Sequence, residues 1–162
     1  MKKMTEQEAY LRLTILCAQA EHCEQEMYDK MKRWEIDETA QSRIIVRLKK
    51  DRYIDDERFA RAFVKDKIRY NKWGRRKVQQ ALWQKHIDAD IQQRILDEID
   101  ENEYLAVLRL LLQQKRKSTK AQSDYELNQK LVRFALSRGF TFDIIRQCLD
   151  VDEDMDIADE TD

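Results

Sequence analysis

The fold is decided by the stretch from Tyr53 to Lys85, which reads YIDDERFARAF at residues 53–63 and KWGRRKV at residues 72–78. Asp55 is placed to cap a helix that begins at residue 56, where acidic side chains complement the positive end of the helix dipole. Apolar residues then recur at helical spacing, with Phe59, Ala62, Phe63 and Tyr70 on one face. Gly74 interrupts the chain, and a second amphipathic run follows it. The stretch therefore predicts two helices joined by a turn.

The composition of the chain extends this helical prediction to its whole length. Its 162 residues include no proline and only two glycines. Tight β-hairpin turns and phosphate-binding loops depend on glycine, so this composition disfavours both. No run of about 18 apolar residues is present, and the first residues lead into polar sequence rather than into an apolar signal core. We therefore expect an all-α, cytoplasmic protein that does not cross a membrane.

An internal repeat organises the predicted helices. Apolar residues recur at the same offsets of 0, 4, 9, 13 and 17 in three places, which begin at Met27, Val78 and Leu131. The three sets are Met27, Met31, Ile36, Ala40 and Ile44; Val78, Leu82, Ile87, Ile91 and Ile95; and Leu131, Ala135, Phe140, Ile144 and Cys148. Glu35, His86 and Gly139 occupy the place where the middle helix of each unit should end, and Asp37, Asp88 and Thr141 follow as helix caps.

A leading helix precedes each of these patterns, at residues 5–20, 56–71 and 102–117. The chain should therefore contain three tandem three-helix repeats that form an elongated array able to curve, because a unit of about 50 residues buries little surface alone. The predicted boundaries are 1–54, 55–100 and 101–149, followed by an acidic, disordered tail at 150–162.

Residue types that carry catalysis or hold metals do not assemble into a recognisable site. The three cysteines have no CxxC spacing, which favours reduced thiols, and helical spacing predicts that Cys17 and Cys148 are buried. Cys17, His22 and Cys23 lack a fourth ligand at zinc-like spacing. The abundant carboxylates are explained by helix starts. We expect no catalytic residue, no metal and no cofactor.

Charge gives the stronger functional signal. The net charge of −1 combines a formal charge of +7 on residues 1–149 with −8 on residues 150–162. Residues 43–77 alone contain fourteen bases and five acids, a field that attracts phosphates. The candidate binding residues are Arg69, Lys72, Trp73, Arg75, Arg76 and Lys77, with Lys49, Lys50 and Arg52 before them. A smaller cluster follows at Lys115, Arg116, Lys117 and Lys120. The alternative is that these bases only solvate helices and that Trp73 packs inward.

The quoted motifs resemble the RecX family of recombination regulators. The resemblance rests on residues 53–63, on residues 72–85, on Glu26-Met27 and on the run from Ser137 to Phe140, and it spans residues 10–149. Tandem three-helix repeats are also a property of that family. The sequence departs from the family pattern at His22-Cys23, at His86, where glycine is usual, and in its acidic tail.

The resemblance implies a non-enzymatic, monomeric protein that acts in DNA recombination, DNA repair and the SOS response. It would bind the RecA recombinase, above all its filament on DNA, and inhibit ATP hydrolysis, strand exchange and coprotease activity. There are two alternatives: a helical protein that binds single- or double-stranded DNA without a recombinase, and a plain helical scaffold. A further hypothesis is that the acidic tail folds back on the basic body or mimics DNA, in which case deleting residues 151–162 should tighten DNA binding.

Overall fold

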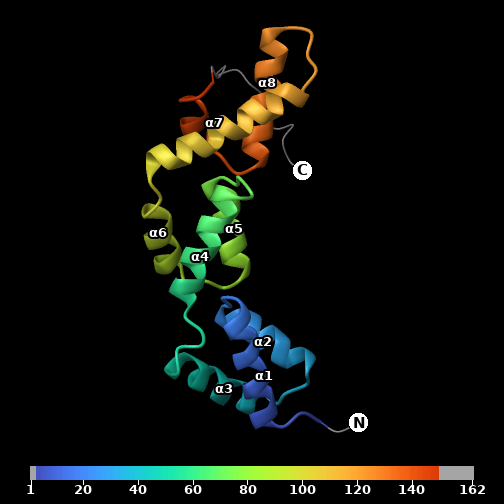
Figure 1. Ribbon diagram of the computed structural model, residues 1–162, viewed down its shortest axis with the longest axis vertical. Helices are drawn as coiled ribbons and strands as arrows, with labels where there is room; N and C mark the ends of the chain where they lie inside the picture. Colours follow the sequence, from blue (N-terminus) through green and yellow to red (C-terminus); the bar gives the residue numbers. More distant parts are fainter. Residues whose placement is uncertain (1–2, 150–162) are drawn as a thin grey trace. The chain divides into compact units, whose positions relative to one another are not determined.

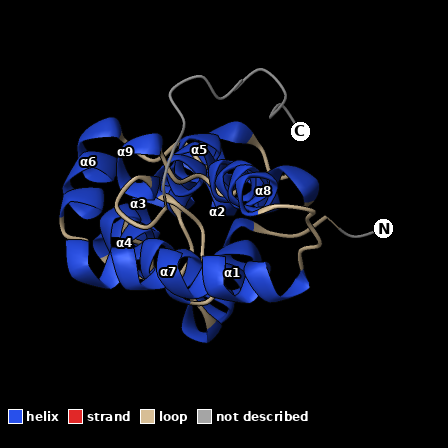
Figure 2. Ribbon diagram, turned by 90° about the horizontal axis from the view of Figure 1, so that it is seen from above, coloured by secondary structure: helices blue, strands red, loops and turns tan. Residues whose placement is uncertain are grey.

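The computed structural model describes residues 3–149, and within this range every regular element is an α-helix (Figure 2). The predicted tail lies outside the described residues. The helices follow one another along the chain in Figure 1 as α1 (Glu6–Gln19), α2 (Glu24–Arg33), α3 (Glu38–Lys50), α4 (Asp56–Arg69), α5 (Arg75–Gln84), α6 (Ala89–Asp97), α7 (Glu101–Ser118), α8 (Asp124–Ser137) and α9 (Phe142–Ile145). The all-α prediction is confirmed. In the described range no helix has the length and apolar character that a membrane span requires.

The chain divides into two compact units by its internal contacts. Unit 1 consists of Met1–Phe63 and Leu82–Ile95, and unit 2 consists of Val64–Ala81 and Leu96–Asp162. The division falls inside α4, α5 and α6, so the middle predicted repeat contributes residues to both units. The predicted repeat boundaries and the elongated shape stay predictions.

Unit 1 is built around α1, α2 and α3, with α1 and α2 both packed on α3 (Figure 1). Its core is formed by Ala9, Tyr10, Leu13, Met27, Met31, Ile36, Ala40, Ile44, Ile45, Leu48 and Ile54. The Tyr10 hydroxyl donates to Asp51 at 2.8 Å, and the Arg47 guanidinium lies 3.7 Å from the Tyr10 ring centroid. The hydrogen bond of its hydroxyl and the contact of its ring with Arg47 thus hold the buried Tyr10 side chain in position.

Unit 2 centres on α7, which packs on α8, and α8 in turn packs on α9. The α7 side chains Tyr104, Leu105, Leu108, Leu111 and Leu112 are buried, as the leucine-rich sequence predicts, although Leu110 is 45% exposed. Tyr104 and Phe140 place their ring centroids 5.2 Å apart. This aromatic pair joins α7 to the turn that follows α8.

The repeat predicted from apolar spacing is confirmed in its burial and in its turns. All fifteen repeat positions are buried except Ile91 and Cys148, which are half-buried. The middle helix of each repeat ends in a left-handed residue, with φ of 57° at Glu35, 57° at His86 and 99° at Gly139. The next N–H bonds back to the helix each time, at 3.0 Å for Ile36 to Met31, 3.1 Å for Ile87 to Leu82 and 3.1 Å for Phe140 to Ala135.

Helix caps follow the prediction in two of the three repeats. Asp37 accepts from the N–H of Thr39 at 3.2 Å, and Asp88 accepts from the N–H of Asp90 at 2.8 Å. Thr141 precedes α9 without a side-chain cap bond, and α9 is only four residues long. Cys148 therefore lies in a turn beyond the helix, which is why its helical register does not bury it.

Two buried glutamines also recur where the apolar pattern gave no signal. Gln41 and Gln92 occupy the same repeat position, and their side-chain amides donate to the carbonyls of Ile36 and Ile87 at 2.7 and 2.8 Å. Each amide satisfies a carbonyl in the turn before the third helix of its repeat. The third repeat has Ile145 at this position.

Three burial predictions are wrong. Tyr70, predicted on the apolar face of α4, is 77% exposed because it follows the last helical residue, Arg69. Of the predicted face Phe59 is buried and Ala62 and Phe63 are half-buried, and the helix also buries Ala60, Val64 and Ile68. Cys17 and Cys148 are half-buried, whereas Cys23 is fully buried. Cys23 occupies the cap position of α2, where tertiary packing rather than helical spacing determines burial.

Replacing His86 by glycine should stabilise the protein by about 1 kcal/mol, because glycine adopts a left-handed conformation without the steric cost that a Cβ imposes. The His86 side chain is exposed, and within residues 3–149 it makes no hydrogen bond or ion pair that the substitution would remove. Urea unfolding measures the effect. The control Gln79→Gly, at an exposed position inside α5, should instead destabilise by about 1 kcal/mol. Equal effects of the same sign at both positions would contradict this account.

Candidate functional site

The basic residues around Gly74 form a defined structure in unit 2. A left-handed Lys72, with φ of 55°, turns the chain after α4, and the Trp73 N–H then bonds to the Lys67 carbonyl at 3.0 Å. The ammonium groups of Lys67 and Lys77 lie 4.9 and 4.7 Å from the Trp73 ring centroid. Trp73 is half-buried, and its ring, which was predicted to stack on bases, makes cation–π contacts with the two lysines.

The start of α5 is held against the turn between α8 and α9 by the only two glycines of the chain. The Gly74 N–H donates to the Arg138 carbonyl at 2.7 Å, and the Arg76 N–H donates to the Gly139 carbonyl at 3.1 Å. A Cβ on Gly74 would lie 2.2 Å from the carbonyl carbon of Gly139, which no side chain tolerates. Gly74 is therefore required by a close backbone contact, whereas the sequence indicated only a break between helices.

Tyr104 supports the same helix start from α7. Its hydroxyl accepts the Arg75 N–H at 2.8 Å, and the Arg75 guanidinium lies 4.2 Å from its ring centroid. Burial raises the pKa of Tyr104 to about 12, so the hydroxyl is neutral at physiological pH. Because the N–H groups of Gly74, Arg75 and Arg76 are all bonded, an anion near α5 would meet side chains rather than free backbone donors.

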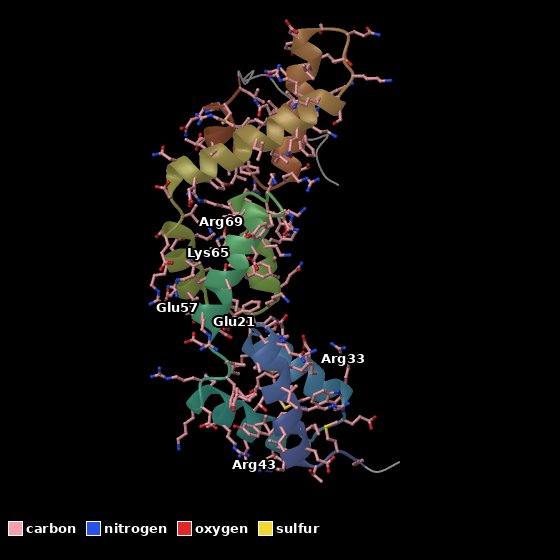
Figure 3. The ribbon with its side chains drawn as sticks, in the orientation of Figure 1. Glu21, Arg33, Arg43, Glu57, Lys65 and Arg69 are labelled. Atoms are coloured by element: carbon pink, nitrogen blue, oxygen red, sulfur yellow. The ribbon has the colours of Figure 1, made fainter. Side chains whose placement is uncertain are left out.

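The cations of this cluster differ in whether they already have carboxylate partners. Arg69, near the end of α4 in Figure 3, is 3.4 Å from Glu103, and Arg75 is 2.9 Å from Glu101. Arg76 is exposed, and in the described chain no carboxylate pairs with it. The first turn of α5 contains no acid, although acids stabilise a helix N-terminus and bases oppose its dipole. Local stability therefore does not explain the charge at this end of α5.

The other three predicted residues belong to unit 1. Lys49 and Lys50 lie in the last turn of α3, where bases complement the helix dipole, and Lys49 is 3.4 Å from Glu24. Arg52 is left-handed, with φ of 62°, and its carbonyl accepts from the Arg58 guanidinium at 3.1 Å. Helix formation and turn geometry account for these positions. The structure thus brings together Arg69, Lys72, Trp73, Arg75, Arg76 and Lys77 in unit 2, and Lys49, Lys50 and Arg52 in unit 1.

The excess positive charge of residues 1–149 belongs entirely to unit 2. Unit 1 contains 15 Lys and Arg residues and 15 Asp and Glu residues, which gives a formal charge of zero. Unit 2 up to residue 149 contains 16 bases and 9 acids, a formal charge of +7. Sequence reasoning missed this difference because the units interrupt one another along the chain. Within residues 1–149, the unit 2 segments are therefore the part that would attract a polyanion.

Among the described residues, Cys17 and His22 make contacts within unit 1 with neighbouring side chains. The Cys17 thiol lies 3.9 Å from the Met27 sulfur, and His22 lies 3.2 Å from Glu26. Burial raises the pKa of Cys23 to about 11, which keeps its thiol protonated. Across residues 3–149, no three or more His, Cys, Asp or Glu side chains are arranged to hold a metal ion.

Comparison with known proteins agrees with this architecture. The RecX second three-helix domain matches residues 55–96, and the RecX third three-helix domain matches residues 101–149. The chain is 36% identical over 126 residues to regulatory protein RecX of Clostridium botulinum strain Eklund 17B, a match that covers 76% of this chain and 58% of that relative. It is 27% identical over 139 residues to regulatory protein RecX of Oceanobacillus iheyensis, covering 86% and 50%. These matches therefore span 58% and 50% of the lengths of the two relatives.

Solved structures show the same fold. A crystal structure of regulatory protein RecX has a TM-score of 0.82 at 20% identity and covers 88% of this chain and 72% of that one. The crystal structure of RecX from Lactobacillus salivarius has a TM-score of 0.77 at 22% identity and covers 88% and 93%. The two domain matches together include more than half of the chain. The chain belongs to the RecX family.

Proposed function

We propose that this protein binds the RecA recombinase on DNA and restrains its ATP hydrolysis, strand exchange and coprotease activity. It would act as a cytoplasmic monomer and by binding alone, without catalysis. Family membership supports a regulatory role, since the relatives it matches are named regulatory proteins. Most of the proposed contact residues lie in unit 2, where the formal charge is +7 up to residue 149.

The observation that carries this assignment is the basic first turn of α5. Three bases, Arg75, Arg76 and Lys77, occupy a helix start that contains no acid, where the helix dipole disfavours them. The Gly74 and Gly139 backbones lock this turn in place, so its side chains emerge from a rigid base. Rigid placement lowers the ordering cost of binding. A partner with a phosphate backbone or an acidic face would gain from such a surface.

The full set of proposed contact residues comprises Arg69, Lys72, Trp73, Arg75, Arg76 and Lys77 in unit 2 and Lys49, Lys50 and Arg52 in unit 1. A RecA filament on DNA repeats the same surface many times. Modest contacts from two units of one chain would add through effective concentration, provided both units can reach the filament at once. This predicts stronger binding to the filament than to its separate components.

Binding to RecA-coated and to naked single-stranded DNA tests the proposal. At physiological salt, with RecA filaments held by a non-hydrolysable ATP analogue, we expect at least about tenfold tighter binding to the coated strand, because both units contribute contacts. Fluorescence anisotropy of the labelled protein measures both affinities. Equal or tighter binding to naked DNA would favour a nucleic-acid-binding protein without a recombinase partner, and binding to neither would favour a helical scaffold.

A further inference from the structure

Trp83, in the last turn of α5, is a large apolar side chain that the core does not cover. It is 72% exposed, because the helix packs through the fully buried Val78 and Leu82 on its other side. Trp34 and Trp73 are half-buried, and each has a cation against its ring. Within residues 3–149 the Trp83 indole makes no hydrogen bond, ring contact or cation–π contact. Packing of the described chain therefore does not account for this side chain.

The exposed face of α5 aligns Trp83 with Arg76. Seven residues separate the two, close to two helical turns, so both side chains lie on one face about 10 Å apart along the axis. The exposed Gln79 and Gln80 lie between them. The helix contains no acid, and within the described range no carboxylate pairs with Arg76. This face therefore presents an aromatic ring and an unneutralised guanidinium, the two groups most often found at binding hot spots.

The charges near Trp83 favour a protein as its partner over a nucleic acid. Rings that stack on nucleic-acid bases are flanked by cations that hold the phosphates. Lys85, the next cation along the chain, is engaged by Glu26 at 2.9 Å. Residues 82–95 contain two basic and two acidic side chains, a formal charge of zero. The ring thus lies in a neutral segment, where an apolar pocket suits it better than a phosphate backbone does.

We infer that Trp83 is an apolar anchor that enters a pocket of a protein partner, and that the rim of this pocket carries a carboxylate for Arg76. The inference rests on the proposed function, in which the partner is the RecA filament. The contact residues proposed above are eight bases and Trp73. The cores of protein interfaces are instead depleted in charge and enriched in aromatic residues. Trp83 supplies the uncovered aromatic side chain that the basic contacts lack.

Trp83→Ala tests the anchor, and the fold should tolerate it because alanine favours helix and the side chain is exposed. Fluorescence anisotropy of the labelled protein measures binding to RecA filaments on single-stranded DNA, held by a non-hydrolysable ATP analogue, and to the naked strand. We expect binding to the filament to weaken about 30-fold, the loss typical of a tryptophan hot spot. Binding to the naked strand should change by less than about twofold, since no base stacks on the ring.

Two further variants and a control define what the pocket recognises. Trp83→Phe keeps an aromatic ring and should weaken binding to the filament by less than about fivefold. Arg76→Gln should weaken it about fivefold through loss of the ion pair, with a smaller loss on the naked strand. The matched control is Ile15→Ala, which removes a 60% exposed apolar side chain from α1 and should bind the filament as the wild type does.

Wild-type affinity of folded Trp83→Ala for the filament would overturn the inference and leave the proposed function intact. If the wild-type protein itself failed to bind the filament, the proposed function would fall and the inference with it. An equal loss on the naked strand would overturn the inference because the ring would then stack on bases, and an equal loss in the Ile15→Ala control would overturn it because no single anchor would exist. Sedimentation gives the last outcome: wild-type dimers that Trp83→Ala abolishes would assign the ring to a second copy of the chain and contradict the inference.

Discussion

Gly74→Ala is expected to destabilise unit 2 by at least about 3 kcal/mol, since overpacking against backbone has no rotamer that relieves it. The new Cβ would lie 2.2 Å and 2.3 Å from the carbonyl carbon and oxygen of Gly139 and 2.3 Å from the Phe140 nitrogen. In a chain of this size such a loss lowers the melting temperature by roughly 6–12 °C. Circular dichroism measures the melt. Hydrogen exchange should show lost protection at the amides of Gly74 and Arg76, whose bonds depend on this contact.

The matched control for this substitution is Arg76→Ala, two residues further along. The Arg76 side chain is exposed, so its removal should change stability by no more than about 0.5 kcal/mol. Equal melting temperatures for the two variants would show that the Gly74 and Gly139 backbones do not pack as described.

Charge reversal at the start of α5 is expected to abolish inhibition of RecA without unfolding the protein. The chosen substitutions are Lys72→Glu, Arg76→Glu and Lys77→Glu, because Arg69 and Arg75 are engaged by Glu103 and Glu101. Acids at a helix N-terminus are favourable, so stability should be retained. A change of six charge units turns attraction to phosphates into repulsion, and we expect inhibition to weaken by at least about 100-fold in concentration.

The matched control places the same charge change in unit 1, as Lys3→Glu, Lys32→Glu and Arg33→Glu. It should inhibit at nearly the wild-type concentration, with a loss below about threefold at physiological salt, where distant charges are screened. Full inhibition by the unit 2 variant, with its circular dichroism unchanged, would remove the start of α5 from the proposed interface.

Local patterns in the sequence were enough to predict the helices and the turns that end the middle helix of each repeat, but not the end of α4 at Arg69 or the short length of α9. The apolar offsets that begin at Met27, Val78 and Leu131 report burial on one helical face, and a left-handed turn follows each middle helix whether the residue is Glu35, His86 or glycine. Both signals act between residues a few positions apart. Both predictions hold in the folded chain because tertiary packing buries the apolar helix faces from which they were made.

The candidate site could be predicted only in part, because its decisive contacts are long-range. Gly74 meets Gly139, and Arg75 meets Tyr104 and Glu101, through packing between turns and helices that no periodicity records. The basic character of residues 69–77 was visible in the sequence, but its carboxylate partners and its junction with Arg138 were not. The rarity of glycine was the one available signal, since two glycines in 162 residues indicate positions where no other residue fits.

The central claim, that this protein restrains RecA, is tested most directly by the rate of RecA ATP hydrolysis on single-stranded DNA as the protein is added. We expect the rate to fall in a saturable way at protein concentrations well below that of RecA, because one bound chain can affect a filament of many subunits. The variant with Lys72, Arg76 and Lys77 changed to Glu should leave the rate at its starting value. An unchanged rate with folded wild-type protein in molar excess over RecA would contradict the account.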